Sequence, residues 1–410
     1  MNYYLNNYAV RDQLIDDLVH DDLGMVVVIP CHNEVTLITA LESLFNCDLP
    51  PCSVEVITVI NASEDAPLSI IEQNKQTLSE AEAWAMLHSK SGLSYHFIEE
   101  NTLPPKHAGV GLARKIGMDE AVRRLETVNN PKGIIVCFDA DAKCTPNYLV
   151  EIERHFKTYP KTPACSIHFE HPIEGKEFSK EIYDGIIQYE LHLRGYKNGL
   201  AYAGLPYAYH TVGSSMAVLS HIYQKQNGMN KRKAGEDFYF LQKLIPLGGF
   251  TELTTAKVIP SPRVSDRVPF GTGKAIADYV AAKEQIISSY NSKSYVDLKQ
   301  FCEVLPDCYD DYQSVSIPKS IRSFLESMDW ERNYNKIRSN STSKDHFIQL
   351  FFKWFNAFKV LKYMHHTRDY FYPDQPVFDV GNSLLTLLGK KQEENLTCML
   401  QKYRVMDQTI

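Results

Sequence analysis

The stretch MVVVIPCHNE, residues 25–34, joins a dense run of apolar, mostly β-branched residues to a polar turn. A continuous apolar run of this length, without alternation, is typical of a strand buried on both faces in a parallel sheet. Pro30 closes the run, and the polar residues CHNE follow it. The stretch predicts a central strand with a polar turn at its carboxyl end, where open α/β sheets bind their ligands.

Strand and helix patterns alternate on the C-terminal side of this stretch. Apolar residues at helical spacing mark the helices, and short β-branched runs mark the strands. The alternation predicts right-handed β-α-β units and a mostly parallel sheet. The predicted helices cover 34–45, 67–90 and 109–127, and the predicted strands cover 54–60, 95–98 and 134–138.

The rest of the chain is less regular. Residues 1–23 predict a short amphipathic helix that Gly24 ends, and the regularity fades between 160 and 210. A strand is predicted over 212–219 and a helix over 236–245, and the last third is mainly helical. We expect three parts: an N-terminal helix (1–24), an α/β domain (25–275) and a helical C-terminal region (276–410).

Composition excludes several classes of protein. The 410 residues carry a formal net charge of -7, which argues against a general affinity for nucleic acid or anionic membranes. The nine cysteines are scattered and form no Cys-x-x-Cys pair, so a zinc ribbon is not expected. Their irregular spacing favours reduced thiols in the cytoplasm. We find no secretory signal and no apolar window of about 18 residues that could span a membrane.

The most informative local feature is Asp139-Ala140-Asp141, which directly follows the strand over 134–138. Residues two apart in extended chain point the same way, so both carboxylates could face one site. Mg²⁺ and Mn²⁺ take a few carboxylates and fill their other positions with phosphate oxygens and water. The motif predicts a metal-diphosphate clamp, with a solvated acidic turn as the alternative.

Two further segments are candidates for chemistry. Glu236 and Asp237 stand at the start of a predicted helix. They could simply be stabilised there by the positive end of the helix dipole, or one of them could act as a general base. The loop SPRVSDRVPFGTGK (261–274) carries arginines that could stabilise a departing diphosphate, or it is a solvated loop. It is not a phosphate-binding P-loop, because Val268 and Ala275 stand where glycine and Ser or Thr are required.

Other nucleotide and phosphate motifs fail. Gly109-Val110-Gly111 lacks a third glycine at the required spacing, since Arg114 stands there, so a nicotinamide-binding domain is not expected. A phosphatase of the haloacid dehalogenase type would place its Asp-x-Asp on the first strand and Thr or Val where Lys143 stands.

Taken in order, these segments resemble family 2 of the glycosyltransferases, with their GT-A fold: a mixed, mostly parallel sheet flanked by helices, here with a C-terminal helical region. The resemblance spans about residues 25–275. Its segments are VVVIPCHNE (26–34), VITVINASED (56–65), GLARKIGMDEA (111–121), Asp139-Ala140-Asp141 and GEDFYFLQKLIPLGG (235–249).

The resemblance implies roles for individual residues. Pro30, His32 and Glu34 would line the nucleoside pocket with Asn61, which stands where the family often has Asp against uracil, so the base stays open. Further implied positions are Arg114 and Ala140 at the nucleotide sugar, Asp139 at ribose or metal, Asp141 at the metal, Asp237 as the base beside Glu236, and Arg267 at the diphosphate.

The activity implied is transfer of a hexosyl group from a UDP- or GDP-type sugar to an unknown hydroxyl acceptor, with Mn or Mg as cofactor and with inversion. The family's Gln-x-x-Arg-Trp segment is absent, which argues for a non-processive enzyme. The alternatives are a nucleotidyltransferase, although CHNEVT lacks the expected Gly-rich basic loop, and a non-catalytic sugar-nucleotide binder.

The C-terminal region carries one strong apolar stripe. A single helix is predicted over 347–364, with Phe351, Phe355, Phe358 and Leu361 on one face. Core or subunit packing is the favoured interpretation, and docking on a membrane surface is the alternative.

Overall fold

The computed structural model describes residues 2–265, 267 and 271–409. It divides into two compact units, and neither is a continuous stretch of chain. Unit 1 holds Met1–Glu177 and Thr211–Lys274, and unit 2 holds Phe178–His210 and Ala275–Thr409. Among the described residues, no helix combines the length and apolar character needed to cross a membrane.

Unit 1 is built on one sheet with the strand order β3-β2-β1-β4-β7-β6-β8-β5. Its strands are β1 (Leu23–Cys31), β2 (Ser53–Ser63), β3 (Leu93–Leu103), β4 (Ile134–Cys137), β5 (Lys143–Cys144), β6 (Ala164–Phe169), β7 (Met216–Leu219) and β8 (Thr251–Ile259). Pairs β1–β2, β1–β4, β2–β3 and β6–β8 are parallel, whereas β4–β7, β6–β7 and β5–β8 are antiparallel. The expected mixed, mostly parallel sheet is confirmed.

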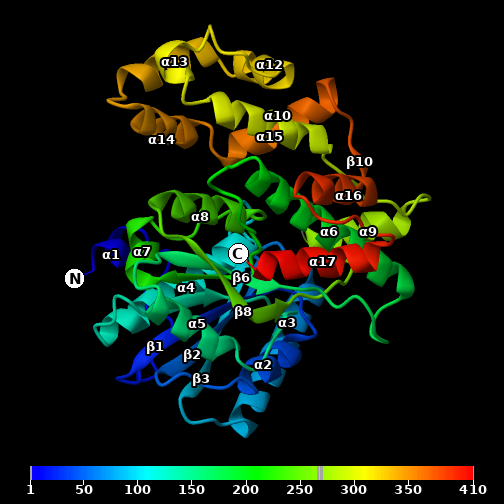
Figure 1. Cartoon of the computed structure of the whole chain (residues 1–410). Helices are drawn as coiled ribbons and strands as arrows, with labels where there is room; N and C mark the ends of the chain where they lie inside the picture. The colour runs from blue at the N-terminus through cyan, green and yellow to red at the C-terminus, as the bar shows by residue number, and fades with distance from the viewer. Residues whose placement is uncertain (1, 266, 268–270, 410) are drawn as a thin grey trace. The chain divides into compact units, whose positions relative to one another are not determined.

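The helices of unit 1 are α1 (Tyr3–Asn7), α2 (Leu37–Phe45), α3 (Leu68–Leu87), α4 (Val110–Thr127), α5 (Tyr148–Thr158), α7 (Ser220–Lys225), α8 (Glu236–Leu244) and the 3-10 helix η1 (Ile245–Leu247), while α9 (Thr272–Ala281) runs on into unit 2. Helices α2, α3, α4, α5 and α7 contact strands of the sheet, and α8 contacts α4 (Figure 1).

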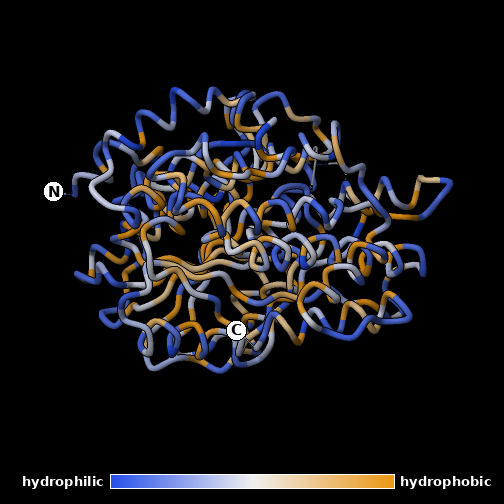
Figure 2. The backbone as a smooth tube through the Cα atoms, turned by 45° about the horizontal axis from the view of Figure 1, so that its top comes forward, coloured by the Kyte–Doolittle hydropathy of each residue, from blue (hydrophilic) through white to orange (hydrophobic). Residues whose placement is uncertain are grey.

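The central strands form the apolar core of unit 1. Every residue of β1 except Gly24 is buried, and so is every residue of β2 except Ser63. Extended segments in the middle of Figure 2 are coloured toward the hydrophobic end of the scale. Because both faces of β1 are covered, its continuous apolar run is explained by burial on both sides.

The order of the strands creates a switch point between β1 and β4. From β1 the chain proceeds to β2 and β3 on one side, and it reaches β4 on the other side. Val28 pairs with Cys137, and the amide of Phe138 continues the ladder by donating to the carbonyl of Val28 at 3.0 Å. The parallel strands β1 and β4 thus end side by side, and such points hold the ligands of open α/β sheets.

The predicted N-terminal helix over 1–23 is wrong. Only Tyr3–Asn7 is helical, and β1 already begins at Leu23. The carboxylate of Glu120 on α4 accepts the backbone N–H groups of Leu14 and Ile15, both at 3.3 Å. Because these amides find partners on α4, the segment lies extended across that helix instead of coiling.

Unit 2 is mainly helical, with a short antiparallel pair of strands. The stretch 160–210, where the sequence pattern faded, in fact contains β6 of unit 1 and the long helix α6 of unit 2. The elements of unit 2 are α6 (Lys180–Tyr202), β9 (Ser288–Ser289), α10 (Ser292–Val304), α11 (Cys308–Asp311), α12 (Lys319–Ser327), α13 (Trp330–Ser339), α14 (Lys344–Trp354), α15 (Ala357–Tyr370), β10 (Gln375–Pro376), α16 (Val377–Leu387) and α17 (Leu396–Gln408).

The single helix predicted over 347–364 is also wrong, because the chain breaks between α14 and α15. Asn356 caps α15 by accepting the backbone N–H of Lys359. Phe351 and Phe355 are almost fully buried, and their rings stack at a centroid distance of 5.2 Å. Phe351 and Phe355 are therefore packed in the core, in agreement with the favoured interpretation, whereas Phe358 and Leu361 are half-buried.

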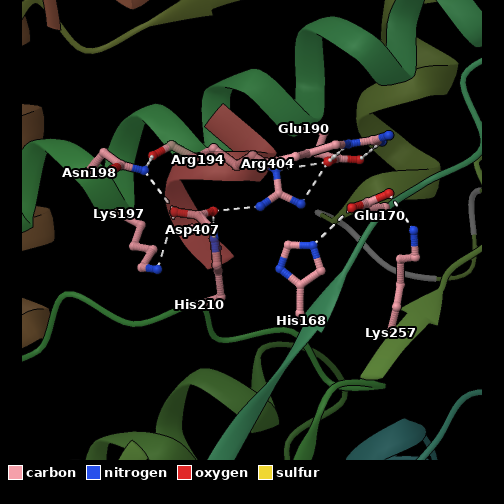
Figure 3. A network of polar contacts seen from close by, with 10 residues as sticks. All are labelled: His168, Glu170, Glu190, Arg194, Lys197, Asn198, His210, Lys257, Arg404 and Asp407. Atoms are coloured by element: carbon pink, nitrogen blue, oxygen red, sulfur yellow. Dashed lines mark hydrogen bonds and ion pairs between the residues drawn. The ribbon is translucent and has the colours of Figure 1, made fainter. Parts of the chain in front are cut away.

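Helices α6 and α17 are joined by buried charges (Figure 3). Asp407 accepts from Arg194 at 2.5 Å, from Asn198 at 3.0 Å and from Lys197 at 3.2 Å. The side chain of Asp407 is only 1% exposed. Such a network requires every member to be satisfied, since an unpaired buried charge is costly.

Candidate active site at the carboxyl ends of β1 and β4

The polar turn after β1 is held by two asparagines. Asn33 adopts a left-handed backbone with a φ of 48°, and its backbone N–H donates to the side-chain oxygen of Asn74 at 2.9 Å. Nδ1 of His32 lies 2.7 Å from the carbonyl of Asn61, at the end of β2. Pro30 lies within β1 beside Val59 and is buried. The structure thus brings the expected nucleoside residues to one edge of the sheet.

The side chain of Asn61 has an unusual position. The residue is 3% exposed, and within the described part of the chain its side-chain oxygen has no hydrogen-bond partner. A buried acceptor without a partner costs about 1–3 kcal/mol. A ligand with an N–H or O–H group could donate the missing hydrogen bond to this oxygen.

Glu34 is the centre of the first charge cluster, which we call the Glu34 cluster and which consists of Glu34, Asp141, Arg263 and Arg267. Arg263 donates to both carboxylate oxygens of Glu34, and its Nε donates to Asp141 at 2.7 Å. Arg267 donates to Glu34 at 3.0 Å and to the carbonyl of Asn33 at 2.6 Å. Two carboxylates and two guanidiniums make this cluster neutral overall.

The pKa values of the two acids in the Glu34 cluster move in opposite directions. Burial acts to raise the pKa of Glu34, but Arg263, Arg267 and a hydrogen bond from Thr36 outweigh it and hold the pKa below its ordinary value. Burial raises the pKa of Asp141 to about 6, despite the opposing charge of Arg263. Asp141 is therefore the acid with the greater need for additional positive charge.

The second charge cluster surrounds Arg114 on α4, and we call it the Arg114 cluster: Arg114, Asp139, Glu236 and Asp237. Arg114 is 1% exposed and donates to Asp139 at 2.5 Å and to Glu236. Burial raises the pKa of both Glu236 and Asp237, and the charge of Arg114 opposes the rise. One guanidinium faces three carboxylates, so two negative charges are in excess when all the acids are ionised.

The turn into α8 aims the two acids. Gly235 caps α8 with a φ of 69°, a left-handed backbone that favours glycine. Glu236 and Asp237 occupy the first helical turn, where the helix dipole favours negative charge. Oδ1 of Asp237 accepts the backbone N–H of Phe238 at 2.7 Å. This bond fixes the carboxylate without using its second oxygen.

Gly213 completes the Arg114 cluster from the segment that leads into β7. A Cβ atom at this position would lie 2.9 Å from Nη1 of Arg114 and 3.2 Å from Oδ2 of Asp237. Only a residue without a side chain allows this close approach. The sequence does not single out Gly213, because nothing local distinguishes it from an ordinary turn glycine.

The structure gathers most of the expected site residues into the two clusters. Arg267 lies at Glu34, Arg114 lies between Asp139 and Glu236, and the buried Ala140 separates the two aspartates in the chain. From the sequence, Arg263 could be recognised only as one of the positively charged residues of the basic loop (261–274). Its contact with both Glu34 and Asp141 joins three distant segments, so no local pattern could reveal it.

The donor set at Asp139 and Asp141 fits a nucleotide-bound cation. Among the described residues, no three His, Cys, Asp or Glu side chains gather as a metal site. Mg²⁺ in nucleotide sites is bound through one or two carboxylates plus phosphates and water. Each aspartate gives one oxygen to an arginine, so a cation at its second oxygen would share the charge of the carboxylate with a guanidinium. The pair suits a cation whose coordination a diphosphate completes.

Comparison with known proteins gives a family for the sheet-forming region. The glycosyl transferase family 2 profile matches residues 26–205. No curated protein matches the sequence.

Two solved structures show how distant the structural likeness is. TarS residues 1–349 from S. aureus, in complex with UDP-GlcNAc, is 14% identical, with 85% of this chain and 91% of that chain covered and a TM-score of 0.41. The mannosyltransferase PcManGT from Pyrobaculum calidifontis, in complex with GDP-Man and Mn²⁺, is 15% identical, with 86% and 93% covered and a TM-score of 0.36. At TM-scores below 0.5 these structures support no inference about the site or the substrate.

The family match covers the segments that carry most of the site. It includes the turn after β1, the start of α4 and Asp139-Ala140-Asp141. The expected enzyme class and fold class are confirmed. Residues 26–205 therefore belong to glycosyl transferase family 2, and the chain is a glycosyltransferase by class.

Proposed function

We propose that this enzyme transfers a hexosyl group from a UDP- or GDP-type sugar to an acceptor hydroxyl, in one inverting displacement and without processive movement. The observation that carries the proposal is the meeting of the Glu34 and Arg114 clusters beyond the neighbouring ends of β1 and β4. Acids for metal and base and cations for a diphosphate stand together there, at the switch point of the sheet.

The nucleoside would lie over the turn after β1. Pro30, His32, Glu34 and Asn61 border this place, and the unpartnered side-chain oxygen of Asn61 would accept an N–H group from the edge of the base. Uracil and guanine both present such a group. An amide can donate as well as accept, so this contact alone favours neither base.

The diphosphate would lie between the two aspartates and the basic loop. Asp139 and Asp141 would hold Mn²⁺ or Mg²⁺, which supplies positive charge to the departing diphosphate when bound. Arg267 is proposed to hold a phosphate oxygen, since a guanidinium offers two parallel donors to one phosphate. Ala140 would allow close approach of the donor, because its side chain is a single methyl group.

Asp237 is proposed as the general base, with Glu236 as its neighbour. Glu236 is engaged by the buried Arg114, whereas Oδ2 of Asp237 lies near Gly213 and Arg114. A base must be ionised and reach the attacking hydroxyl, and burial raises the pKa of Asp237 toward a useful range. Arg114 would keep the excess negative charge of the cluster in place.

The test of this proposal is the Asp237→Asn variant. Donor binding should survive, since the amide is isosteric, whereas turnover should fall about 10²–10⁴-fold, the ordinary contribution of a general base. The assay should follow release of nucleoside diphosphate and of pyrophosphate separately. Asp184→Asn, a surface acid of α6 that pairs with Lys180, is the matched control and should retain full turnover.

Each outcome separates the proposal from its two rivals. Release of pyrophosphate from a nucleoside triphosphate supplied together with a sugar 1-phosphate would indicate a nucleotidyltransferase. Donor binding without any transfer by the unmodified protein would indicate a non-catalytic sugar-nucleotide binder. Full turnover by Asp237→Asn would show that the assignment of the base is wrong.

We further propose that the enzyme works in the cytoplasm. All nine cysteines are free thiols in the structure, and a reducing compartment keeps thiols in that state.

A further inference from the structure

Arg263 bridges the two acids of the Glu34 cluster. It forms a two-pronged contact with Glu34, and its Nε donates to Oδ2 of Asp141 at 2.7 Å. Its side chain is 24% exposed, and that of Asp141 is 23% exposed, so this ion pair lies at the surface of the site. The same guanidinium therefore contacts Glu34, which borders the proposed nucleoside site, and Asp141, the acid proposed to bind the metal.

The contact at Asp141 competes with a divalent cation. The guanidinium at Oδ2 neutralises part of the charge of the carboxylate, so a metal at either oxygen of Asp141 would bind more weakly while Arg263 stays there. The contact at Glu34 does not share this conflict. If Arg263 left, Glu34 would keep Arg267 at 3.0 Å and two hydrogen bonds from Thr36 at 2.7 and 3.0 Å. The buried Glu34 would thus keep hydrogen-bond partners and a positive charge, so release of Arg263 would not leave a buried carboxylate unpaired.

We propose that Arg263 is a tethered cation that takes the metal's place at Asp141 until the donor arrives, and then turns to the donor diphosphate. The divalent cation and the diphosphate would arrive at this point together. The cation alone would have to break the Arg263–Asp141 pair without compensation. With a diphosphate present, the released guanidinium gains a bidentate partner.

The consequence is positive coupling between metal and nucleotide. Each ligand makes the other's binding more favourable, and the coupling must be equal in both directions. Arg263 would then prevent the site from holding a metal before the donor is present. This inference rests on the proposed function in one respect, since it places the donor diphosphate beside the Glu34 cluster.

Arg267 offers a matched control, because it belongs to the same cluster and differs in one contact. It donates to Glu34 and to the carbonyl of Asn33, and no contact with Asp141 is recorded among the described residues. Arg263→Gln and Arg267→Gln both remove one positive charge close to Glu34. Only the first of these variants removes the guanidinium from the metal-binding acid.

The experiment is a titration of the full chain with Mn²⁺ alone, followed by electron paramagnetic resonance. Arg263→Gln should bind Mn²⁺ about tenfold more tightly than the unmodified chain, which is within the usual range of coupling between sites. Arg267→Gln should change the affinity by less than about threefold, since it alters only the surrounding potential. Repeating the titration with saturating UDP or GDP should show a smaller gain from the nucleotide in Arg263→Gln.

An unchanged or weaker Mn²⁺ affinity in Arg263→Gln would overturn the inference, as would an equal gain in Arg267→Gln. Should Arg263→Gln fail to fold, Arg263→Lys keeps the charge and loses the planar fork, so its Mn²⁺ affinity should still exceed that of the unmodified chain. Failure of the proposed function has a different signature, because the unmodified chain would then bind neither UDP nor GDP.

Discussion

Gly213 leaves little room between Arg114 and Asp237. A Cβ atom on Gly213 would come within 2.9 Å of the guanidinium and 3.2 Å of Oδ2 of Asp237. Arg114 is fully buried and engaged by Asp139 and Glu236, so it has little room to give way. We predict that Gly213→Ala lowers kcat/KM about 10²-fold, since a misplacement near 1 Å costs about that much.

The control for this substitution is Gly195→Ala in α6. There the nearest side chain would lie 3.7 Å from the new methyl group, which is ordinary contact. This variant should keep full activity and gain up to about 1 kcal/mol of helix stability. Circular dichroism would show whether both proteins fold, and equal kcat/KM values for the two would contradict the role of Gly213.

The buried acids predict the pH dependence of the enzyme. Burial raises the pKa of Glu236 to about 7, and the charges of Asp237 and Asp139 add to the rise while Arg114 opposes it. A base works only when ionised, and the ionised fraction falls as the pH drops through a raised pKa. Burial also raises the pKa of Asp237, the proposed base. We therefore predict that kcat/KM declines with falling pH at a pH above the ordinary carboxyl range near 4.

The Glu236→Gln variant tests the origin of that decline. It removes one negative charge next to Asp237, so the acidic limb of kcat/KM should move to lower pH. Because the two acids interact, the limb belongs to the pair. A limb that stays in the ordinary carboxyl range in the unmodified enzyme would contradict this account.

At the scale of single residues, the sequence predicted acids more readily than their partners. Asp139, Asp141 and Glu236 stand at recognisable places, after a strand or at the start of a helix. Arg263 acquires its role from Asp141, and Gly213 acquires its role mainly from Arg114, and in both cases more than 90 positions separate the residues. Such roles depend on the tertiary fold, and no local periodicity carries them.

Helices α6 and α17 depend on Asp407 for their contact. Burial alone would raise the pKa of Asp407, but the hydrogen bond from His210 and the charges of Lys197 and Arg194 outweigh it and hold the pKa far below its ordinary value. We predict that Asp407→Ala destabilises unit 2 by roughly 3–5 kcal/mol, because it leaves buried cations uncompensated. Urea unfolding followed by circular dichroism measures the effect.

The sign of the pH effect follows from the lowered pKa. Asp407 contributes its stability fully above the pKa of an unfolded aspartate, about 4, and loses it as the pH falls further. The control is Asp369→Ala, which breaks a surface pair with Arg368 and should cost no more than about 1 kcal/mol. Equal losses in the two variants would contradict the role of the buried network.

At the scale of elements, strong periodic segments were predicted well and weakly patterned ones were not. The predicted helix over 109–127 corresponds to α4 (Val110–Thr127), and the strand over 54–60 lies inside β2 (Ser53–Ser63). Helix α6 was missed because buried charged residues such as Glu190 and Arg194 interrupt its apolar pattern. The break after α14 depends on a single cap, Asn356, within an otherwise continuous apolar stripe.

The two units cross the boundaries expected from the sequence, in that 178–210 is grouped with 275–409. The expected division at residue 275 stays a prediction about independent domains. Glu190 and Arg194 on α6 are fully buried, and their partners Arg404 and Asp407 come from α17. The length of the chain and its periodicity do not reveal that residues 178–210 are grouped with the C-terminal helices.

We predict that a fragment ending at residue 275 does not fold as the full chain does. It would keep α6 and lose α16 and α17, which pack against it in unit 2. The fragment would expose an apolar face together with unpaired charges, and both promote aggregation. Size-exclusion chromatography of the fragment should show aggregate, whereas a monodisperse fragment with a cooperative unfolding transition would support an independent domain.

The central claim is that a nucleoside diphosphate sugar binds with a divalent cation beyond the ends of β1 and β4. Calorimetry with a panel of nucleoside diphosphates and their sugars, with and without Mn²⁺, tests it most directly, using the full chain and its Asp141→Ala variant. The account predicts that UDP or GDP and its sugar bind in the presence of Mn²⁺, and that Asp141→Ala abolishes the effect of the cation. Folded protein that binds none of them, or Asp141→Ala that responds to Mn²⁺ as the unmodified chain does, would contradict it.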